Sequence, residues 1–221
     1  CVFKCRNKVD GKMYAIKNIV KKSKEKYALE ILKEIRTISA FDHPNIIRYF
    51  TSWIEIVENE DPVVSLLKES DKMSDILQVH NKKKISAYLV MECAELTLDK
   101  FITLHYGSIL YDKHHTAIIM QIASGLHYLH NLIPQCAHGD LTTNNILLVN
   151  KGGNIAIKIC DFGMAKFFPM SEIEKIKNVQ SEEHKNTEIL QLHNLCDADI
   201  QVHLQHDMYK FGIVIFQLIT F

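Results

Sequence analysis

The sequence predicts an α+β protein in two parts, the first rich in strands and the second largely helical. Four short stretches at 2–5, 13–19, 46–57 and 85–91 are rich in apolar, β-branched and aromatic residues, which favour strands. From residue 98 onward, apolar residues recur at the spacing that places them on one face of a helix. The chain has 221 residues, 47% of them hydrophobic and 24% charged, which is enough to bury a sizeable core. Ligand clefts favour the junction between two such parts.

The first part begins with a predicted hairpin and a helix. Val2–Cys5 and Met13–Ile19 are predicted to be strands, and Asp10-Gly11 between them is a strong hairpin signal. An amphipathic helix is predicted over Lys24–Ala40, and the turn residues 42–45 break it. The apolar positions that indicate this helix are Leu29, Leu32, Ile35 and Ile38.

Two more strands are predicted in the first part, at residues 46–57 and 85–91. Residues 58–84 lie between them and differ in character, because they are polar, charged and only weakly periodic. This composition predicts a mobile insert.

The second part is predicted to be mostly helical, with helices over residues 98–105 and 112–132. Short strands are predicted at 146–149 and 155–159, around the turn Lys151–Asn154. Residues 169–205 are polar and carry no assignment, whereas residues 207–221 are predicted to form a buried apolar helix. The stripe that indicates the longer of the first two helices consists of Ile118, Ile122, Leu126 and Leu129.

Charge and cysteine usage exclude several classes of protein. The 26 basic and 26 acidic residues balance, so nothing favours direct binding to nucleic acid or to an anionic membrane surface. The six cysteines are scattered and show no C-x-x-C spacing, which predicts a reducing compartment and a cytoplasmic location. No apolar run reaches the length of a membrane span, and no signal peptide is visible.

The first chemically informative cluster joins a lysine on a strand to a glutamate on the following helix. Lys17 ends the apolar strand segment Tyr14-Ala15-Ile16, and burying an unpaired ammonium group there would be costly. Glu34 can pair with this ammonium group and aim it at a phosphate. Taken alone, Lys17 is more typical of a surface residue at the edge of a strand.

The second cluster is the segment His138–Asn145, which precedes an apolar strand. Asp140 and Asn145 are five residues apart, so both side chains can occupy one loop. Asp140 would accept or orient the proton of a substrate hydroxyl, and Asn145 would hold a metal ion. The alternative is a turn rich in Asp and Asn without a chemical role.

The third cluster, Asp161-Phe162-Gly163, directly follows the predicted strand 155–159. A carboxylate at this position can bind magnesium, which prefers hard oxygen ligands and phosphates. Gly163 allows a sharp turn. Asp-x-Gly by itself is common in turns, so this cluster gains its meaning only from the other two.

In this order and at these separations, the three clusters resemble the protein kinase family over essentially the whole chain. Tyr14–Lys17 is similar to the family's V-A-I-K strand, and Glu34 to the glutamate of its helix C. The pair Asp140 and Asn145 is similar to the catalytic-loop pair, and Asp161–Gly163 to the D-F-G motif. The family therefore implies that Asp140, Lys17 and Glu34 are catalytic and that Asn145 and Asp161 bind metal.

The resemblance implies an α+β, bilobal protein kinase-like fold with a β-rich N-lobe, residues 1–92, and a helical C-lobe, residues 93–221. Residues 161–206 would be a divergent activation segment. The implied activity is that of a serine/threonine kinase, with ATP and Mg²⁺ as cofactors and a protein as substrate. The residues implied in ATP binding are Val2, Ala15, Lys17, Met91 (the gatekeeper), Glu92, Ala94 and Leu147.

Two structural roles also follow from the resemblance. Asp207 begins a segment similar to the family's buried helix F, where this aspartate anchors the catalytic loop. Ile38, His138 and Phe162 would stack as part of the regulatory spine, although ordinary core packing would explain these three residues as well.

A narrower resemblance is to the stress-response kinases that phosphorylate the α subunit of translation initiation factor 2. It rests on His43–Phe50, on Trp53–Glu55 and on the insert at 58–84, and some cell-cycle kinases share a similar arginine-tyrosine-tryptophan stretch. This group implies the factor's α subunit as substrate and a dimer of kinase domains as an assembly.

The chain departs from the kinase pattern at several points. Gly139 replaces the arginine of His-Arg-Asp, so regulation by a phosphate on the activation segment is doubtful. Thr142 replaces the lysine that normally meets the γ-phosphate. No Ala-Pro-Glu motif occurs between Asp161 and Asp207. The matched region begins after the glycine-rich loop and stops within helix F, so we expect a chain truncated at both ends.

These departures leave three functions open. The first is an active ATP-dependent protein kinase, and the second is a pseudokinase that binds nucleotide as a scaffold. The third is an ATPase-like accessory subunit, because Leu141-Thr142-Thr143 resembles the catalytic loop of an atypical kinase from a tRNA-modification complex. Separately, His193, Cys196, His203 and His206 have spacings that could coordinate zinc, although twelve histidines make chance clustering common.

Overall fold

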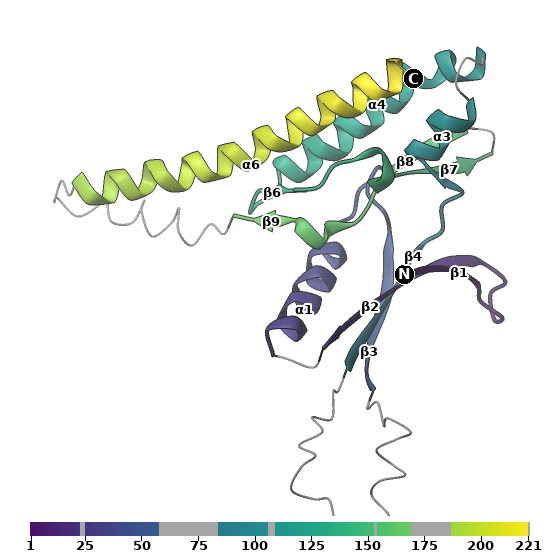
Figure 1. Ribbon diagram of the computed structural model, residues 1–221, viewed down its shortest axis with the longest axis horizontal. Helices are drawn as coiled ribbons and strands as arrows, with labels where there is room; N and C mark the ends of the chain where they lie inside the picture. Colours follow the sequence, from purple (N-terminus) through teal and green to yellow (C-terminus); the bar gives the residue numbers. More distant parts are fainter. Residues whose placement is uncertain (23–24, 58–83, 106–108, 153, 169–186, 221) are drawn as a thin grey trace, which may run out of the picture. The chain divides into compact units, whose positions relative to one another are not determined.

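The protein is described by a computed structural model that covers residues 1–22, 25–57, 84–105, 109–152, 154–168 and 187–220 (Figure 1). The described residues form two compact units, and each is considered by itself. Residues 1–40 and 49–93 make the first unit, and residues 41–48 and 94–221 make the second. The predicted insert at 58–84 lies almost entirely outside the described residues, and so do residues 169–186 of the predicted activation segment.

The first unit is an antiparallel sheet with one helix against it. Strands β1 (Val2–Arg6), β2 (Met13–Lys22), β3 (Tyr49–Val57) and β4 (Lys84–Glu92) are arranged in the order β1-β2-β4-β3. The predicted hairpin joins β1 to β2, and Gly11 in its turn has a positive φ of 70° that favours glycine. Helix α1 (Glu25–Ser39) contacts β2, β3 and β4.

One predicted apolar position of α1 is wrong, since the Leu29 side chain is 60% exposed. Among the described side chains of α1, the buried apolar residues are Ile31 and Ile38, which lie with Glu34 on the face turned to the sheet. Leu29 is two positions before Ile31, a rotation of about 200° on a helix, so it points the opposite way. The need to bring Glu34 to Lys17 therefore selects which stripe of α1 is buried.

Strand β3 begins three residues later than predicted, because residues 45–47 bond to another strand in the second unit. The Ile47 N–H donates to the Ile159 carbonyl over 2.9 Å, and the Ile159 N–H donates to the Asn45 carbonyl over 2.8 Å. The Asn45 side chain is buried and donates to the Ile157 carbonyl over 3.1 Å. Backbone groups used in this way are not available for pairing within the first sheet.

The second unit is built on helices α3 (Leu98–His105), α4 (Ile109–His130) and α6 (Thr187–Thr220). Its larger sheet has the order β5-β7-β8, from Leu96–Thr97, Ile146–Lys151 and Asn154–Ile159. A second pair joins β6 (Cys136–Ala137) to β9 (Lys166–Phe167). The predicted apolar stripe of α4 is confirmed, because all four of its residues are fully buried: Ile118, Ile122, Leu126 and Leu129.

Helix α6 begins 20 residues before the helix that the sequence predicts, and it runs alongside α4 (Figure 1). The added segment contains neither glycine nor proline, so nothing in it interrupts a helix once tertiary contacts favour one. Ile200 and Leu204 supply those contacts, since both are buried in a cluster with Ala137 against which Phe168 packs. Within the described residues, no helix is both long enough and apolar enough to cross a membrane.

The packing of α4 generates a stability prediction. Replacing Ile122 by Ala should lower the free energy of unfolding by about 2–5 kcal/mol, because a fully buried side chain would leave a cavity. Urea unfolding followed by circular dichroism measures this change. Met120→Ala on the exposed side of the same helix is the control and should change stability by less than about 0.5 kcal/mol. Equal losses in the two variants would contradict the assignment of the buried face.

Candidate functional site

In the first unit, Lys17 on β2 is joined to Glu34 on α1. Lys17 Nζ donates to Glu34 Oε1 over 2.7 Å, and the two side chains are 21% and 16% exposed. This contact resolves the cost of placing an ammonium group within an apolar strand, because the charge has a partner close by. Lys17 is thereby held at the sheet instead of extending into solvent.

The strand register defines which other side chains share the face of Lys17. Residues directly opposite each other in an antiparallel sheet point to the same side, and neighbours along a strand alternate. Val2 is opposite Lys17, and Ala15 is opposite Met91 and two residues from Lys17. Three residues implied in adenine binding therefore lie on the same face as the lysine, while Glu92 at the end of β4 lies on the other face.

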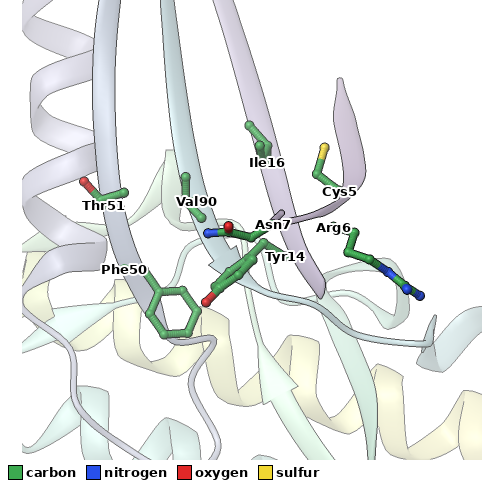
Figure 2. Close-up of a pocket in the computed structure, with 8 residues that line it drawn as sticks. All are labelled: Cys5, Arg6, Asn7, Tyr14, Ile16, Phe50, Thr51 and Val90. Carbon is green, nitrogen blue, oxygen red and sulfur yellow. The ribbon is translucent and has the colours of Figure 1, made fainter. Parts of the chain in front are cut away.

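That other face carries a shallow hollow of about 400 Å³ (Figure 2). Tyr14, Ile16 and Val90 alternate with Ala15, Lys17 and Met91, so the hollow is not on the face where the nucleotide is expected. Phe50 contributes to it because a bulge between Tyr49 and Thr51 places an extra residue in β3, and its ring meets Tyr14 edge-on at 5.3 Å. The full lining is Cys5, Arg6, Asn7, Tyr14, Ile16, Phe50, Thr51 and Val90.

In the second unit, Asp140 and Asn145 are brought together at the two ends of one loop. Asn145 Nδ2 donates to the backbone carbonyl of Asp140 over 2.8 Å and to its Oδ2 over 3.1 Å. Both acceptors are oxygens, so the amide nitrogen must face Asp140, which turns Asn145 Oδ1 away from that residue. The Asp140 side chain is exposed, while Leu141 beside it is buried and fixes the loop to the core.

Asp161 is positioned next to this loop by its neighbours in the chain. The Cys160 N–H donates to the Asn145 carbonyl over 2.9 Å, and Ile159 pairs with Ile146 in the β7–β8 register. Asp161 itself has a φ of 66°, an uncommon value for a residue with a side chain. Such strain concentrates at functional sites, which agrees with a carboxylate held in a special orientation.

The loop is anchored by Asp207 on α6. The Asp207 side chain is fully buried. Its Oδ2 accepts from the His138 N–H over 2.7 Å, and its Oδ1 accepts from the Gly139 N–H over 2.9 Å. His130 Nε2 lies 2.9 Å from Oδ2. Burial alone would raise the pKa of Asp207, but the hydrogen bonds from His130, Gly139 and His138 outweigh it and hold the pKa below its ordinary value.

His138 bridges the loop and the strand that leads to Asp161. Its Nδ1 accepts from the Asp140 N–H over 3.2 Å, so Nε2 carries the proton and donates to the Cys160 carbonyl over 3.0 Å. The neutral ring therefore satisfies both partners. Burial lowers the pKa of His138, although the Cys160 carbonyl and the carboxylates of Asp207, Asp140 and Asp161 act in the other direction.

Phe162 packs on His138 at 5.0 Å between ring centroids and on Phe41 at 4.7 Å. The predicted stack of His138 and Phe162 is therefore present in the second unit. Ile38 belongs to the first unit, so its part in the same stack stays a prediction. Phe41 was not expected at this position, since a single aromatic after a helix gives no sign of its partner.

The predicted site residues divide between the units, and their convergence around one nucleotide stays a prediction. Ala94 follows β4, and Leu147 on β7 is half-buried opposite Lys158. The first unit carries Val2, Ala15, Lys17, Glu34, Met91 and Glu92, and the second carries Ala94, Asp140, Asn145, Leu147 and Asp161.

The suggested zinc ligands do not form a cluster among the described side chains. His203 Nε2 lies 2.7 Å from Lys166 Nζ, so its lone pair is already used by a hydrogen-bond donor. No group of metal-binding side chains is found within the described residues. The side chains of His193 and Cys196 lie outside them.

An antiparallel sheet with a paired lysine and glutamate, followed by a helical unit with an anchored aspartate–asparagine loop, defines the protein kinase fold. The protein kinase domain profile matches residues 1–221, so the chain belongs to the protein kinase family. The kinase domain of Rad53 in a crystal structure with its SCD2 segment has the same fold, with a TM-score of 0.56. It is 20% identical and covers 100% of this chain and 62% of that one.

Among curated relatives, the eIF-2-alpha kinase GCN2 of Arabidopsis thaliana is 28% identical over 237 residues, covering 97% of this chain and 18% of that protein. Eukaryotic translation initiation factor 2-alpha kinase 1 of Mus musculus is 36% identical over 109 residues, covering 45% and 17%. Cyclin-dependent kinase-like 4 of Homo sapiens is 26% identical over 220 residues, covering 99% and 47%. The chain thus spans less than half the length of each of these proteins.

The buried neutral His138 generates a pH prediction. The pKa of His138 is lowered in the folded state. When the pH drops below the ordinary pKa of 6.5, His138 is therefore protonated in the unfolded chain but stays neutral in the folded chain. Stability should therefore fall as the pH drops below about 6.5, by up to about 1.4 kcal/mol per pH unit for this group. Urea unfolding between pH 7 and pH 5 measures the slope.

The matched variant is His138→Gln, which cannot take up a proton. The difference in slope between the variant and the natural chain isolates His138 from the other histidines. Identical slopes would show that His138 is not held neutral in the folded protein.

Proposed function

We propose that this kinase domain is catalytically active and transfers the γ-phosphoryl group of ATP to a serine or threonine hydroxyl of a protein. The observation that carries the proposal is the anchored loop of the second unit. Asp207 holds the peptide groups of His138 and Gly139, and Asn145 donates to Asp140 from the far end of the loop. Asp140 is therefore an exposed carboxylate on a rigid support, as a residue that receives a substrate hydroxyl must be.

The side chains of this loop fit a magnesium ion. Asn145 Oδ1 is turned away from Asp140. Asp161 supplies a carboxylate and directly follows Cys160, whose N–H donates to the Asn145 carbonyl. Oxygen donors of these two kinds suit magnesium, which is normally shared with nucleotide phosphates. When bound, the ion would neutralise charge on the transferred phosphoryl group.

The roles of the protein's own side chains follow from charge and position. Lys17, held by Glu34, would bind the α- and β-phosphates of ATP, and Asp140 would orient the acceptor hydroxyl and take its proton. Val2, Ala15 and Met91 would contact adenine from the lysine face of the sheet. Thr142, in place of a lysine, removes one contact to the γ-phosphate.

The proposed substrate is the α subunit of translation initiation factor 2, and the proposed location is the cytoplasm. The substrate is supported by the names of the relatives, since both GCN2 and the mouse kinase are described as kinases of that subunit. The chain covers less than a fifth of either relative, so the substrate requires a direct phosphorylation assay.

A pseudokinase is the second candidate, favoured by Gly139 and Thr142. Both replace charged residues of the family pattern, and such a domain would bind nucleotide without transferring phosphate. The two candidates make the same prediction for nucleotide binding and opposite predictions for phosphoryl transfer.

Replacing Asp140 by Asn should lower the rate of phosphoryl transfer by about 10²-fold or more, while ATP binding is retained. The reason is that the amide keeps the size of the carboxylate but cannot accept a proton. Transfer of radiolabel from ATP to the factor's α subunit and to a general kinase substrate measures the first effect, and titration with a fluorescent ATP analogue measures the second.

Asn144→Ala is the control, because Asn144 is an exposed neighbour in the same loop. It should keep both properties. Equal transfer by Asp140→Asn would exclude Asp140 as the catalytic residue. A natural chain that binds ATP and labels neither substrate nor itself would establish the pseudokinase instead. Labelling of the general substrate alone would exclude the factor as substrate.

A further inference from the structure

Gly139 makes a backbone contact that no other amino acid could make without a shift in the structure. Its φ is +81°, in the left-handed region that favours glycine. A Cβ built on it would lie 2.6 Å from the Met164 carbonyl oxygen and 3.2 Å from the Met164 carbonyl carbon. Both are backbone atoms, so a flexible side chain cannot move aside to relieve the overlap. The peptide that follows Asp161-Phe162-Gly163 thus lies directly on the catalytic loop.

Neither side of this contact is free to give way. The Gly139 N–H is bonded to the fully buried Asp207. On the other side, the Ala165 N–H donates to the Phe162 carbonyl over 3.1 Å, and the Ala165 side chain is buried. Close approach of two anchored backbones is a situation in which the absence of a side chain is a packing requirement.

Beyond Met164 the same segment is held by a short sheet. Lys166 pairs with Ala137 and Phe167 with Cys136 in the β6–β9 register. The Phe168 N–H then donates to the Gln135 carbonyl over 3.0 Å. Residues 164–168, which we call the docked segment, are therefore bonded along their length to the chain that leads into the catalytic loop.

The docked segment is also attached to α6. Lys166 Nζ lies 2.7 Å from His203 Nε2, and the Phe168 ring packs at 5.8 Å from the His203 ring. Phe168 also packs against the buried cluster of Ala137, Ile200 and Leu204. These residues of α6 come before Asp207, in the part of the helix that the sequence did not predict.

We propose that Gly139 is a positioning residue for phosphoryl transfer. Because it lacks a side chain, the docked segment can pack backbone against backbone on the catalytic loop. The segment after Asp161 is then set in place by these contacts. This inference rests on the proposed kinase function, but the docking itself can be measured without any activity.

The first experiment compares Gly139→Asn with Gly152→Asn. Gly152 also has a positive φ, of 61°, but a Cβ there meets nothing within 4 Å. Asn tolerates the left-handed region better than other residues with side chains, so the Cβ contact with Met164 is the main difference between the variants. Amide hydrogen exchange of Ala165 and Phe168 reports on docking, and the amides of α4 report on the overall fold.

Gly139→Asn should speed exchange at Ala165 and Phe168 by tenfold or more, with α4 unchanged, whereas Gly152→Asn should leave all of them unchanged. Equal exchange at Ala165 and Phe168 in the two variants would overturn the proposal. If Gly139→Asn also loses protection in α4, Lys166→Ala is used, since it weakens the contact to His203 alone. Faster exchange at Phe168 in that variant supports the docking, and unchanged exchange overturns it.

The second experiment measures activity. Gly139→Arg restores the family's usual residue. If the natural chain has merely lost an arginine, the variant should keep or gain activity. If the fold requires glycine at this position, the kcat of the variant should fall by tenfold or more. Unchanged or higher kcat in Gly139→Arg would overturn the proposal. If the natural chain transfers no phosphate at all, the kinase function fails, and the exchange measurement alone decides the docking.

Discussion

The buried carboxylate of Asp207 is the constraint on which the second unit depends. A charge without exposure to solvent is stable only when hydrogen bonds replace its water, and Asp207 obtains them from His138, Gly139 and His130. Because two of these donors are consecutive peptide groups, the carboxylate fixes the backbone of the loop 138–145 and not merely one side chain. The same hydrogen bonds support Asp140 at the surface and attach α6 to the loop through Asp207.

A comparable charge constraint organises the first unit. The contact between Lys17 and Glu34 selects the buried stripe of α1, and the strand register then places Val2, Ala15 and Met91 on the lysine face. Tyr14, Ile16 and Val90 are left on the other face, where they line the hollow with Phe50. The strand register thus separates the face that carries the ion pair, and is suited to an anionic ligand, from the face that carries the hollow.

The departures from the kinase pattern are informative when they are considered with their neighbours. In the sequence, Gly139 stands where the family has an arginine. In the folded chain, the Met164 backbone lies against this glycine. The added turns of α6 are polar in sequence, yet they carry the residues that hold the docked segment: Ile200, His203 and Leu204. The start of the predicted activation segment is therefore supported by α6.

The sequence by itself determined the family, the main helices and the longer strands. It also paired Lys17 with Glu34 and placed Asp140 and Asn145 in one loop, because motif spacing and periodicity are local properties of the chain. It did not predict the two-residue strands β5, β6 and β9. It did not determine the exposure of Leu29, the late start of β3 or the early start of α6. Each of these depends on a contact with residues distant in sequence: Lys17 for α1, Ile159 for residues 45–47, and Phe168 for α6. Tertiary structure decided these three features because long-range hydrogen bonds and burial outweigh single-residue propensities, which are about a few tenths of a kcal/mol.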